Sequence, residues 1–167
     1  MDSYSRTEIE NIIEKYGNTI YRAAYVQVKN RAQADDVFQE VCIKLLRQKK
    51  QIGNEEHLKA WLLKATNDCC KDYWKSAWCR KVTVDHQLVQ EERESYGAET
   101  TGYLTECMQQ LPYKYRMILH LFYYEEYSIR EIAKMLHMKE NTVSSRLSRG
   151  REKLKQIFQK GGKEYEF

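Results

Sequence analysis

Residues 127–155, YSIREIAKMLHMKENTVSSRLSRGREKLK, contain the pattern that decides the fold of the C-terminal half. Ser128 and Glu131 have the spacing of a capping box, in which each side chain accepts from the other's backbone N–H and a helix begins. The apolar residues that follow share one helical face: Ile129, Ile132, Ala133 and Leu136. After a short break, Asn141 or Thr142 can cap a second helix. Its apolar residues also share one face: Val143, Leu147, Leu154 and Phe158. The stretch predicts a helix-turn-helix.

The opposite face of the second predicted helix carries small hydroxyls and cations: Ser144, Ser145, Ser148, Arg149 and Arg151. Hydroxyls reach base edges or phosphates, and arginine forms paired hydrogen bonds with guanine or a phosphate. Such a helix is suited to the major groove of duplex DNA. This stretch alone leaves open the alternative of a solvated basic face on an ordinary helix pair.

Charge is distributed unevenly along the 167 residues, although the formal net charge is only +4. Residues 139–160 contain seven Lys or Arg and two acidic residues, whereas residues 81–103 contain two basic and five acidic residues. The C-terminal segment therefore attracts DNA and the middle segment repels it.

Helical periodicity covers most of the chain, and one proline and seven glycines favour an all-α fold. The N-terminal part predicts three long helices, over about residues 7–30, 32–48 and 56–77. Helical spacing stops after them and resumes at Leu104, and Pro112 suits the first turn of a further helix. We therefore expect two small helical domains, residues 1–80 and 103–167, joined by a flexible acidic linker over residues 81–102.

Several protein classes are disfavoured by the composition. The first ten residues, MDSYSRTEIE, lack the apolar core of a signal peptide, and no apolar run approaches the length of a membrane span. Five cysteines without an export signal predict reduced thiols in the cytoplasm. No cofactor or metal site is expected, because no glycine-rich phosphate loop, C-x-x-C or H-E-x-x-H occurs.

A catalytic constellation is also missing from the sequence. The adjacent carboxylates Asp35 and Asp36 cannot share a substrate proton, because consecutive residues on a helix point about 100° apart. Taken alone, they are expected in the first turn of the second helix, where negative charge suits the helix dipole. We therefore expect a protein that is not an enzyme.

The third predicted helix interleaves cations with aromatic rings: Lys59, Trp61, Lys64, Lys71, Tyr73, Trp74, Lys75, Trp78, Arg80 and Lys81. Bases of single-stranded DNA stack on rings while amines follow the phosphates. The two rings on the apolar stripe, at positions 61 and 73, are expected in the core, whereas Trp74 and Trp78 either stack with bases or line the edge of the core. Asn67 and Asp68 gain nothing from a helix interior, which favours a contact role.

At this point the order of the motifs resembles the extracytoplasmic-function (ECF) sigma factors, the small two-domain specificity subunits of bacterial RNA polymerase. Residues 20–25 (IYRAAY) and 33–41 (QADDVFQEV) are similar to the segment that docks on the polymerase clamp helices. Residues 58–68 (LKAWLLKATND) are similar to the segment that reads and opens the −10 promoter element.

The third similar segment is the −35 helix-turn-helix of the family. Residues 111–112 (LP) precede it, and residues 127–133 (YSIREIA) and 142–147 (TVSSRL) carry the likeness. This sequence departs from the family at His137, where glycine is usual and where the chain must make its corner in another way. Serines at positions 144 and 148 also replace larger or basic residues that are common there, and the adjacent cysteines 69 and 70 are unusual.

The resemblance implies three sets of site residues. The polymerase clamp would be contacted by Asp36, Gln39 and Glu40. The −10 element would be contacted by Lys64, Asn67, Asp68, Lys71 and Trp74, with Asn67 near the extruded base. The −35 element would be contacted by Thr142, Ser144, Ser145, Arg146, Ser148, Arg149 and Arg151, with Arg146 and Arg151 on phosphates.

The resemblance also implies partners: core RNA polymerase, promoter DNA and an anti-sigma factor. The acidic linker is expected to run through the nucleic-acid channel of the polymerase. Two other interpretations stay open. A stand-alone helix-turn-helix regulator would bind a duplex operator without polymerase. A helical adaptor would bind only proteins, and Arg149→Ala would leave all nucleic-acid binding unchanged.

Overall fold

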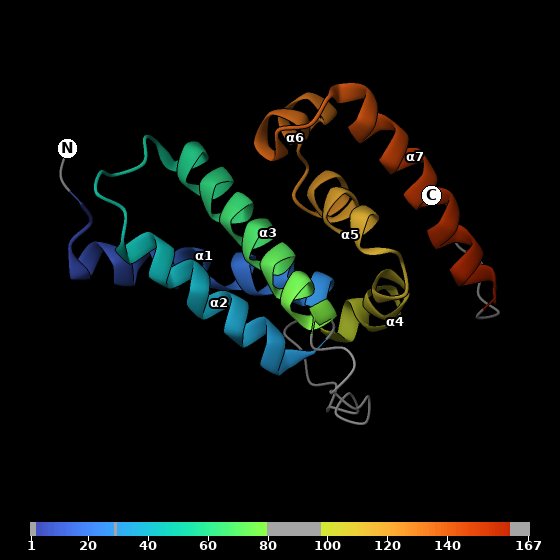
Figure 1. Ribbon diagram of the computed structural model, residues 1–167, viewed down its shortest axis with the longest axis horizontal. Helices are drawn as coiled ribbons and strands as arrows, with labels where there is room; N and C mark the ends of the chain where they lie inside the picture. The colour runs from blue at the N-terminus through green and yellow to red at the C-terminus, as the bar shows by residue number, and fades with distance from the viewer. Residues whose placement is uncertain (1–2, 29, 80–97, 161–167) are drawn as a thin grey trace. The chain divides into compact units, whose positions relative to one another are not determined.

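The computed structural model describes residues 3–28, 30–79 and 98–160, and within these ranges the regular structure is entirely helical (Figure 1). The chain divides into two compact units, Met1–Tyr96 and Gly97–Phe167. Among the described residues, no helix combines the length and apolar character needed to cross a membrane.

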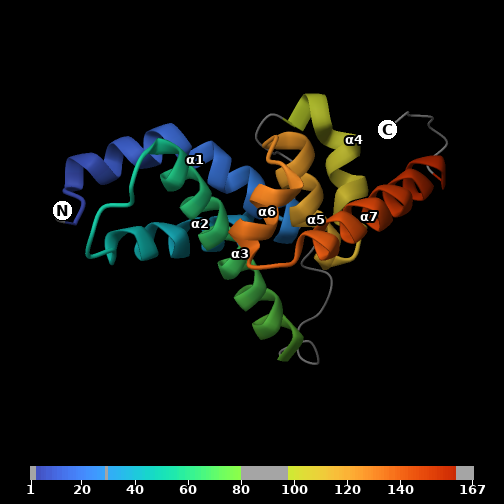
Figure 2. The same ribbon diagram turned by 90° about the horizontal axis from the view of Figure 1, so that it is seen from above.

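The first unit contains three helices: α1 (Arg6–Val28), α2 (Arg31–Leu46) and α3 (Glu55–Cys79). Each of them contacts the other two, as Figures 1 and 2 show. Their shared core holds the apolar stripes that the periodicity predicts, including Ile20, Val41 and Leu62. The rings of Trp61 and Tyr73 pack against this core and are partly buried, as expected.

Cys69 and Cys70 of α3 are both buried in the same core. A cysteine behaves there as a small apolar residue. Burial raises the pKa of the Cys69 thiol, which keeps it protonated and unreactive. The unusual pair is therefore explained by packing.

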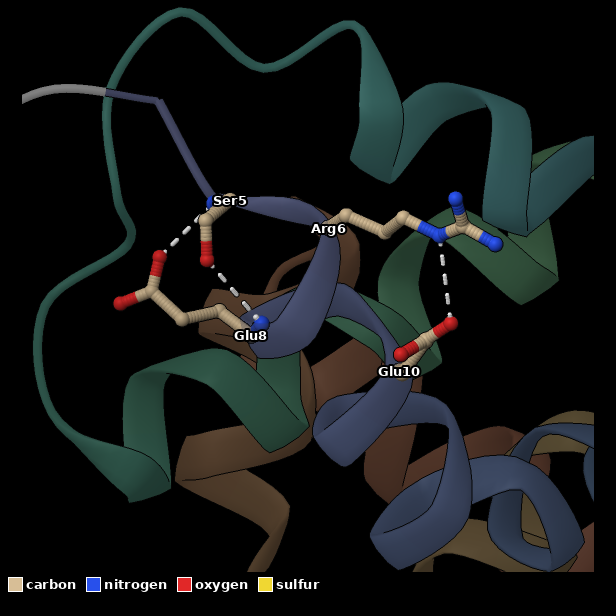
Figure 3. Close-up of polar contacts among 4 residues, drawn as sticks. All are labelled: Ser5, Arg6, Glu8 and Glu10. Carbon is tan, nitrogen blue, oxygen red and sulfur yellow. Dashed lines mark hydrogen bonds and ion pairs between the residues drawn. The ribbon is translucent and has the colours of Figure 1, made fainter.

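A capping box begins α1 and is drawn in Figure 3. The backbone N–H of Ser5 donates to Oε2 of Glu8 at 2.7 Å, and the backbone N–H of Glu8 donates to Oγ of Ser5 at 3.2 Å. Nε of Arg6 pairs with Oε2 of Glu10 at 3.4 Å one turn further on. The helix starts at Arg6, one residue before the predicted start, and its S-x-x-E signal lies in the sequence.

The start of α2 corrects one expectation. Oδ1 of Asn30 accepts from the backbone N–H of Gln33 at 2.8 Å, so the helix begins at Arg31. Asp35 and Asp36 lie beyond its first turn, outside the range over which the helix dipole acts most strongly.

The second unit contains α4 (Ala98–Gln109), α5 (Tyr113–Leu119), the π-helical turn η2 (His120–Tyr124), α6 (Ile129–Leu136) and α7 (Glu140–Lys160). Residues 98–102 are helical, which corrects the expectation that the linker extends to residue 102. The rings of Tyr103 and Phe158 lie 5.3 Å apart, so packing of α4 on α7 outweighs the weak helix propensity of the Thr-Thr-Gly sequence. The rest of the expected linker, residues 81–97, lies outside the described residues.

The turn between α6 and α7 is made without glycine. His137 adopts the left-handed conformation, with φ of 56° and ψ of 47°, and its backbone N–H donates to the carbonyl of Ala133. The next helix then begins at Glu140, so Asn141 and Thr142 lie in its first turn and the prediction that one of them caps it is wrong. Because the left-handed His137 ends α6, only Met138 and Lys139 separate it from α7, and the capping position therefore precedes Asn141 and Thr142.

Candidate nucleic-acid interface

The helix-turn-helix is present as the sequence predicts. Ser128 and Glu131 form the expected capping box at the start of α6, with bonds of 3.0 Å and 2.9 Å. The inward face of α7 is buried at Val143, Leu147, Gly150, Leu154 and Phe158. Only Gly150 of these was not predicted, because glycine has no side chain to register in a hydrophobic pattern.

The opposite face of α7 carries all seven residues assigned to the −35 element. Ser144, Ser148 and Arg149 are exposed, whereas Thr142, Ser145, Arg146 and Arg151 are half-buried. Burial of the apolar face of α7 against α5 and α6 fixes the orientation of the helix and so directs these side chains away from the core.

Unpaired cations lie on both sides of this face. A shallow groove on the α5 side is lined by Lys114 and Tyr115 together with Arg146 and Arg149 of α7. A second groove, at the corner between the helices, is lined by three more cations: Arg130, Lys134 and Lys139. No ion pair is formed within the described part of the chain by the following five cations: Arg130, Lys134, Lys139, Arg146 and Arg149.

Cations clustered around an outward helix face give it the positive charge that attracts a phosphate backbone. Sequence reasoning missed Lys114, Arg130 and Lys134. The i, i+4 spacing of Arg130 and Lys134 on the polar side of α6 was the available signal.

Arg151 lies at the edge of the outward face, next to the π-helical turn. Its Nη1 donates to the hydroxyl of Tyr123 at 2.7 Å. Tyr123 is 49% exposed, and its ring packs edge-on against Phe122 with centroids 4.9 Å apart. Sequence reasoning treated this aromatic segment only as a turn.

The five residues assigned to the −10 element lie on one face of α3, since they recur at three- and four-residue spacing: Lys64, Asn67, Asp68, Lys71 and Trp74. Nζ of Lys64 pairs with Oδ2 of Asp68 at 2.7 Å, and Lys71 is exposed. Asn67 is only 8% exposed, so a base reaches its amide only after the groups that cover it move.

Trp74 is half-buried, and its indole N–H donates to the carbonyl of Gln27 at 3.1 Å. This bond ties the second half of α3 to the end of α1 and leaves part of the ring accessible. The side chain of Trp78, with Arg80 and Lys81, lies outside the described residues.

The outward face of α2 holds the residues assigned to the polymerase clamp. Asp36, Gln39 and Glu40 are all exposed, at i, i+3 and i+4 spacing. Two apolar residues adjoin them, Ile43 at 36% and Leu46 at 61% exposure. Exposed apolar side chains thus adjoin the acidic residues on this face of α2.

Two family models match the chain, one over each of its two units. The family model "Sigma-70 region 2" matches residues 12–80, and the model "Sigma-70, region 4" matches residues 101–154. The RNA polymerase sigma factor SigV of Bacillus subtilis is 30% identical over 139 residues, covering 82% of this chain and 82% of SigV. The ECF RNA polymerase sigma factor SigM of the same organism is 27% identical over 161 residues, covering 92% of this chain and 96% of SigM.

Solved structures show the same fold. The sigma factor RpoE of Bartonella quintana, in its complex with the anti-sigma factor NepR, superposes with a TM-score of 0.71 at 19% identity. The match covers 90% of this chain and 96% of that one. The structure of CnrH in complex with the cytosolic domain of CnrY gives a TM-score of 0.64 at 16% identity, covering 93% of this chain and 90% of CnrH.

Proposed function

Because this chain belongs to the ECF group of the sigma-70 family of RNA polymerase sigma factors, we propose that it binds bacterial core RNA polymerase and directs it to specific promoters. One observation supports the proposal: along the chain, outward faces of α2, α3 and α7 carry in turn an acidic set, a set of cations with an aromatic ring, and a set of hydroxyls with cations, the order that the family resemblance implies. The chain supplies binding surfaces and catalyses no reaction itself, and it acts in the cytoplasm.

On α2, Asp36, Gln39 and Glu40 contact the polymerase clamp, with Ile43 and Leu46 adding apolar contact area. Glu40→Arg reverses a charge at the centre of this face and should weaken co-elution with core polymerase at least tenfold. Glu14→Arg, at an exposed position of α1, is the matched control. Equal co-elution of the two variants would show that polymerase docks elsewhere.

On α3, Lys64 and Lys71 contact the phosphates of the separated non-template strand, and Trp74 stacks on one of its bases. Asn67 binds an extruded −10 base. Asp68 holds Lys64 in place through its ion pair. The buried position of Asn67 supports a sequence of events in which binding of polymerase or promoter first uncovers its side-chain amide.

On α7, the hydroxyls of Thr142, Ser144, Ser145 and Ser148 and the guanidinium of Arg149 contact base edges of the −35 element, while Arg146 and Arg151 contact phosphates. Arg149→Ala should reduce promoter binding by the holoenzyme about 5- to 100-fold, the cost of one good bidentate contact. Gln159→Ala, an exposed substitution near the end of the same helix, is the control.

The decisive experiment combines the chain with core RNA polymerase. Size-exclusion chromatography tests co-elution, and run-off transcription on a library of random-sequence templates tests promoter choice. A stable complex that enriches one −35 and −10 pair is expected. A chain that selects a duplex palindrome without polymerase would instead be a stand-alone regulator.

The acidic segment between the units serves, in this proposal, as a mimic of nucleic acid in the polymerase channel. Since α4 begins at Ala98, a deletion that tests the segment alone removes residues 85–97. Initiation should fall while −35 binding by the second unit persists. Unaltered transcription after the deletion would remove this role.

An anti-sigma factor is proposed as the inhibitory partner. The support is the fold that this chain shares with the sigma factor RpoE, whose solved structure is a complex with an anti-sigma factor. Such a protein should compete with core polymerase for this chain, so its addition should abolish the co-eluting complex.

A further inference from the structure

We infer that Tyr123 is an additional DNA-contacting residue, and that its hydroxyl and the guanidinium of Arg151 together bind one backbone phosphate of duplex DNA. The inference deepens the proposed function, because it rests on α7 entering a DNA groove. No role for Tyr123 follows from the sequence pattern.

The direction of the hydrogen bond decides what the tyrosine can do next. Nη1 of Arg151 donates to the Tyr123 oxygen at 2.7 Å, so the hydroxyl proton points away from the arginine. Among the described residues, Arg151 makes no other hydrogen bond or ion pair, which leaves most of its five N–H donors available. The pair therefore presents O–H and N–H donors side by side without an acceptor of its own.

These donors suit a phosphate. A hydroxyl that accepts from a cation is polarised and becomes a stronger donor itself, and hydrogen bonds to an ionised oxygen are the strong class. Tyrosine hydroxyls and arginines are both regular phosphate contacts in protein–DNA complexes.

The position on the molecule agrees with this chemistry. Arg151 follows Ser144 by seven residues and Ser148 by three, so it shares their side of α7. Tyr123 reaches it from η2, whose π-helical turn holds one residue more than an α-helical turn and so changes the direction of the tyrosine. The pair thus lies on the flank of the recognition helix opposite the groove that contains Lys114.

The test uses the full chain and a duplex of about 30 base pairs of mixed sequence, because phosphate contacts do not depend on sequence. Fluorescence anisotropy gives the Kd at several salt concentrations between about 50 and 200 mM. The variants are Tyr123→Phe, Arg151→Ala and the double variant. Tyr124→Phe is the matched control, since Tyr124 neighbours Tyr123 and is 48% exposed.

Tyr123→Phe should weaken binding about three- to tenfold, the effect of losing one hydrogen bond of typical net strength. Its plot of log K against log salt should keep the wild-type slope, because no charge is removed, whereas Arg151→Ala should lower that slope by about one unit. In the Arg151→Ala background, Tyr123→Phe should change the Kd less than twofold, and Tyr124→Phe should match the wild type. Thermal unfolding followed by circular dichroism should show the same midpoint for Tyr123→Phe and the wild type.

The inference is overturned if Tyr123→Phe binds within a factor of two of the wild type, or if it causes the same loss with and without Arg151. Run-off transcription separates this outcome from failure of the proposed function. Promoter-specific transcripts together with unchanged binding by Tyr123→Phe would remove only the tyrosine contact. The expected binding changes without any promoter-specific transcript would remove only the proposed function.

Discussion

Gly150 of α7 lies against Tyr115 of α5 so closely that a Cβ on the glycine would be 3.1 Å from the tyrosine Cβ. It would also be 3.2 Å from Cδ1 of Leu119. The two helices that hold the DNA-facing side chains outward therefore meet at a position where any side chain is crowded.

Gly150→Ala is expected to destabilise the protein by about 1 kcal/mol, because overpacking at this contact exceeds the gain in helix propensity. Gly17→Ala is the control: its Cβ would meet Phe38 only at 3.6 Å, so it should stabilise α1 by about 0.5–1 kcal/mol. Urea unfolding measures both. Equal stabilisation by the two alanines would show that α5 and α7 can separate at no cost.

His137→Gly should stabilise the second unit by about 0.5–1 kcal/mol, because the left-handed conformation is strained for histidine and free for glycine. Since the imidazole is exposed, little packing is lost. His57→Gly, at an exposed position in the first turn of α3, should destabilise instead through lower helix propensity. Thermal unfolding distinguishes the two, and a destabilised His137→Gly variant would contradict the strain.

Acid should weaken the start of α1. The backbone N–H of Ser5 is the main cause that lowers the pKa of Glu8 below its ordinary value, and the Ser5 hydroxyl adds to it. A carboxyl whose pKa is lower in the folded than in the unfolded state adds stability above its unfolded pKa, and this stability is lost as pH falls through the folded pKa.

Glu8→Gln should therefore reduce stability at pH 7 and flatten its decline between roughly pH 5 and pH 3. The urea midpoint as a function of pH gives the result. Glu10→Gln removes a carboxylate from the same exposed turn, where only the surface ion pair with Arg6 is lost, and should leave the profile close to that of the wild type. Identical profiles for Glu8→Gln and the wild type would contradict the role of the capping box.

Trp74 allows its packing role and its stacking role to be separated. Trp74→Phe removes the N–H that donates to Gln27 and should cost about 1 kcal/mol, yet it keeps a ring for a base. Trp74→Ala should lose both. Urea unfolding measures stability, and permanganate reactivity of the −10 thymines measures strand opening by the holoenzyme. Loss of opening in Trp74→Phe with unchanged stability would show that the N–H, rather than the ring, meets DNA.

The long helices follow from sequence because their apolar residues repeat over many turns, as Ile20, Val41 and Leu62 do within their stripes. Both capping boxes, at Ser5 and Ser128, have the S-x-x-E signal in the sequence. Periodicity alone does not assign a function to the three outward faces, because Asp36 or Asn67 alone is an ordinary polar residue on a helix. Their assignment depends on the family resemblance.

The remaining features depend on contacts between distant residues. The bond from Trp74 to the carbonyl of Gln27 spans 47 positions, and that from Arg151 to Tyr123 spans 28. No local pattern predicts a π-helical turn, and the sequence indicated a corner at His137 but not that the histidine itself adopts the left-handed conformation. These features, like the start of α4 at Ala98, depend on tertiary packing and not on local sequence.

The π-helical turn at His120–Tyr124 makes the number of residues in this segment as important as their identity. Loss of a single residue there would restore an ordinary α-helical turn and rotate everything before it by about 100° relative to α6 and α7. A deletion screen should therefore find this segment far less tolerant of length changes than of substitutions. The turn works as a spacer, setting the register between the first and last helices of the second unit.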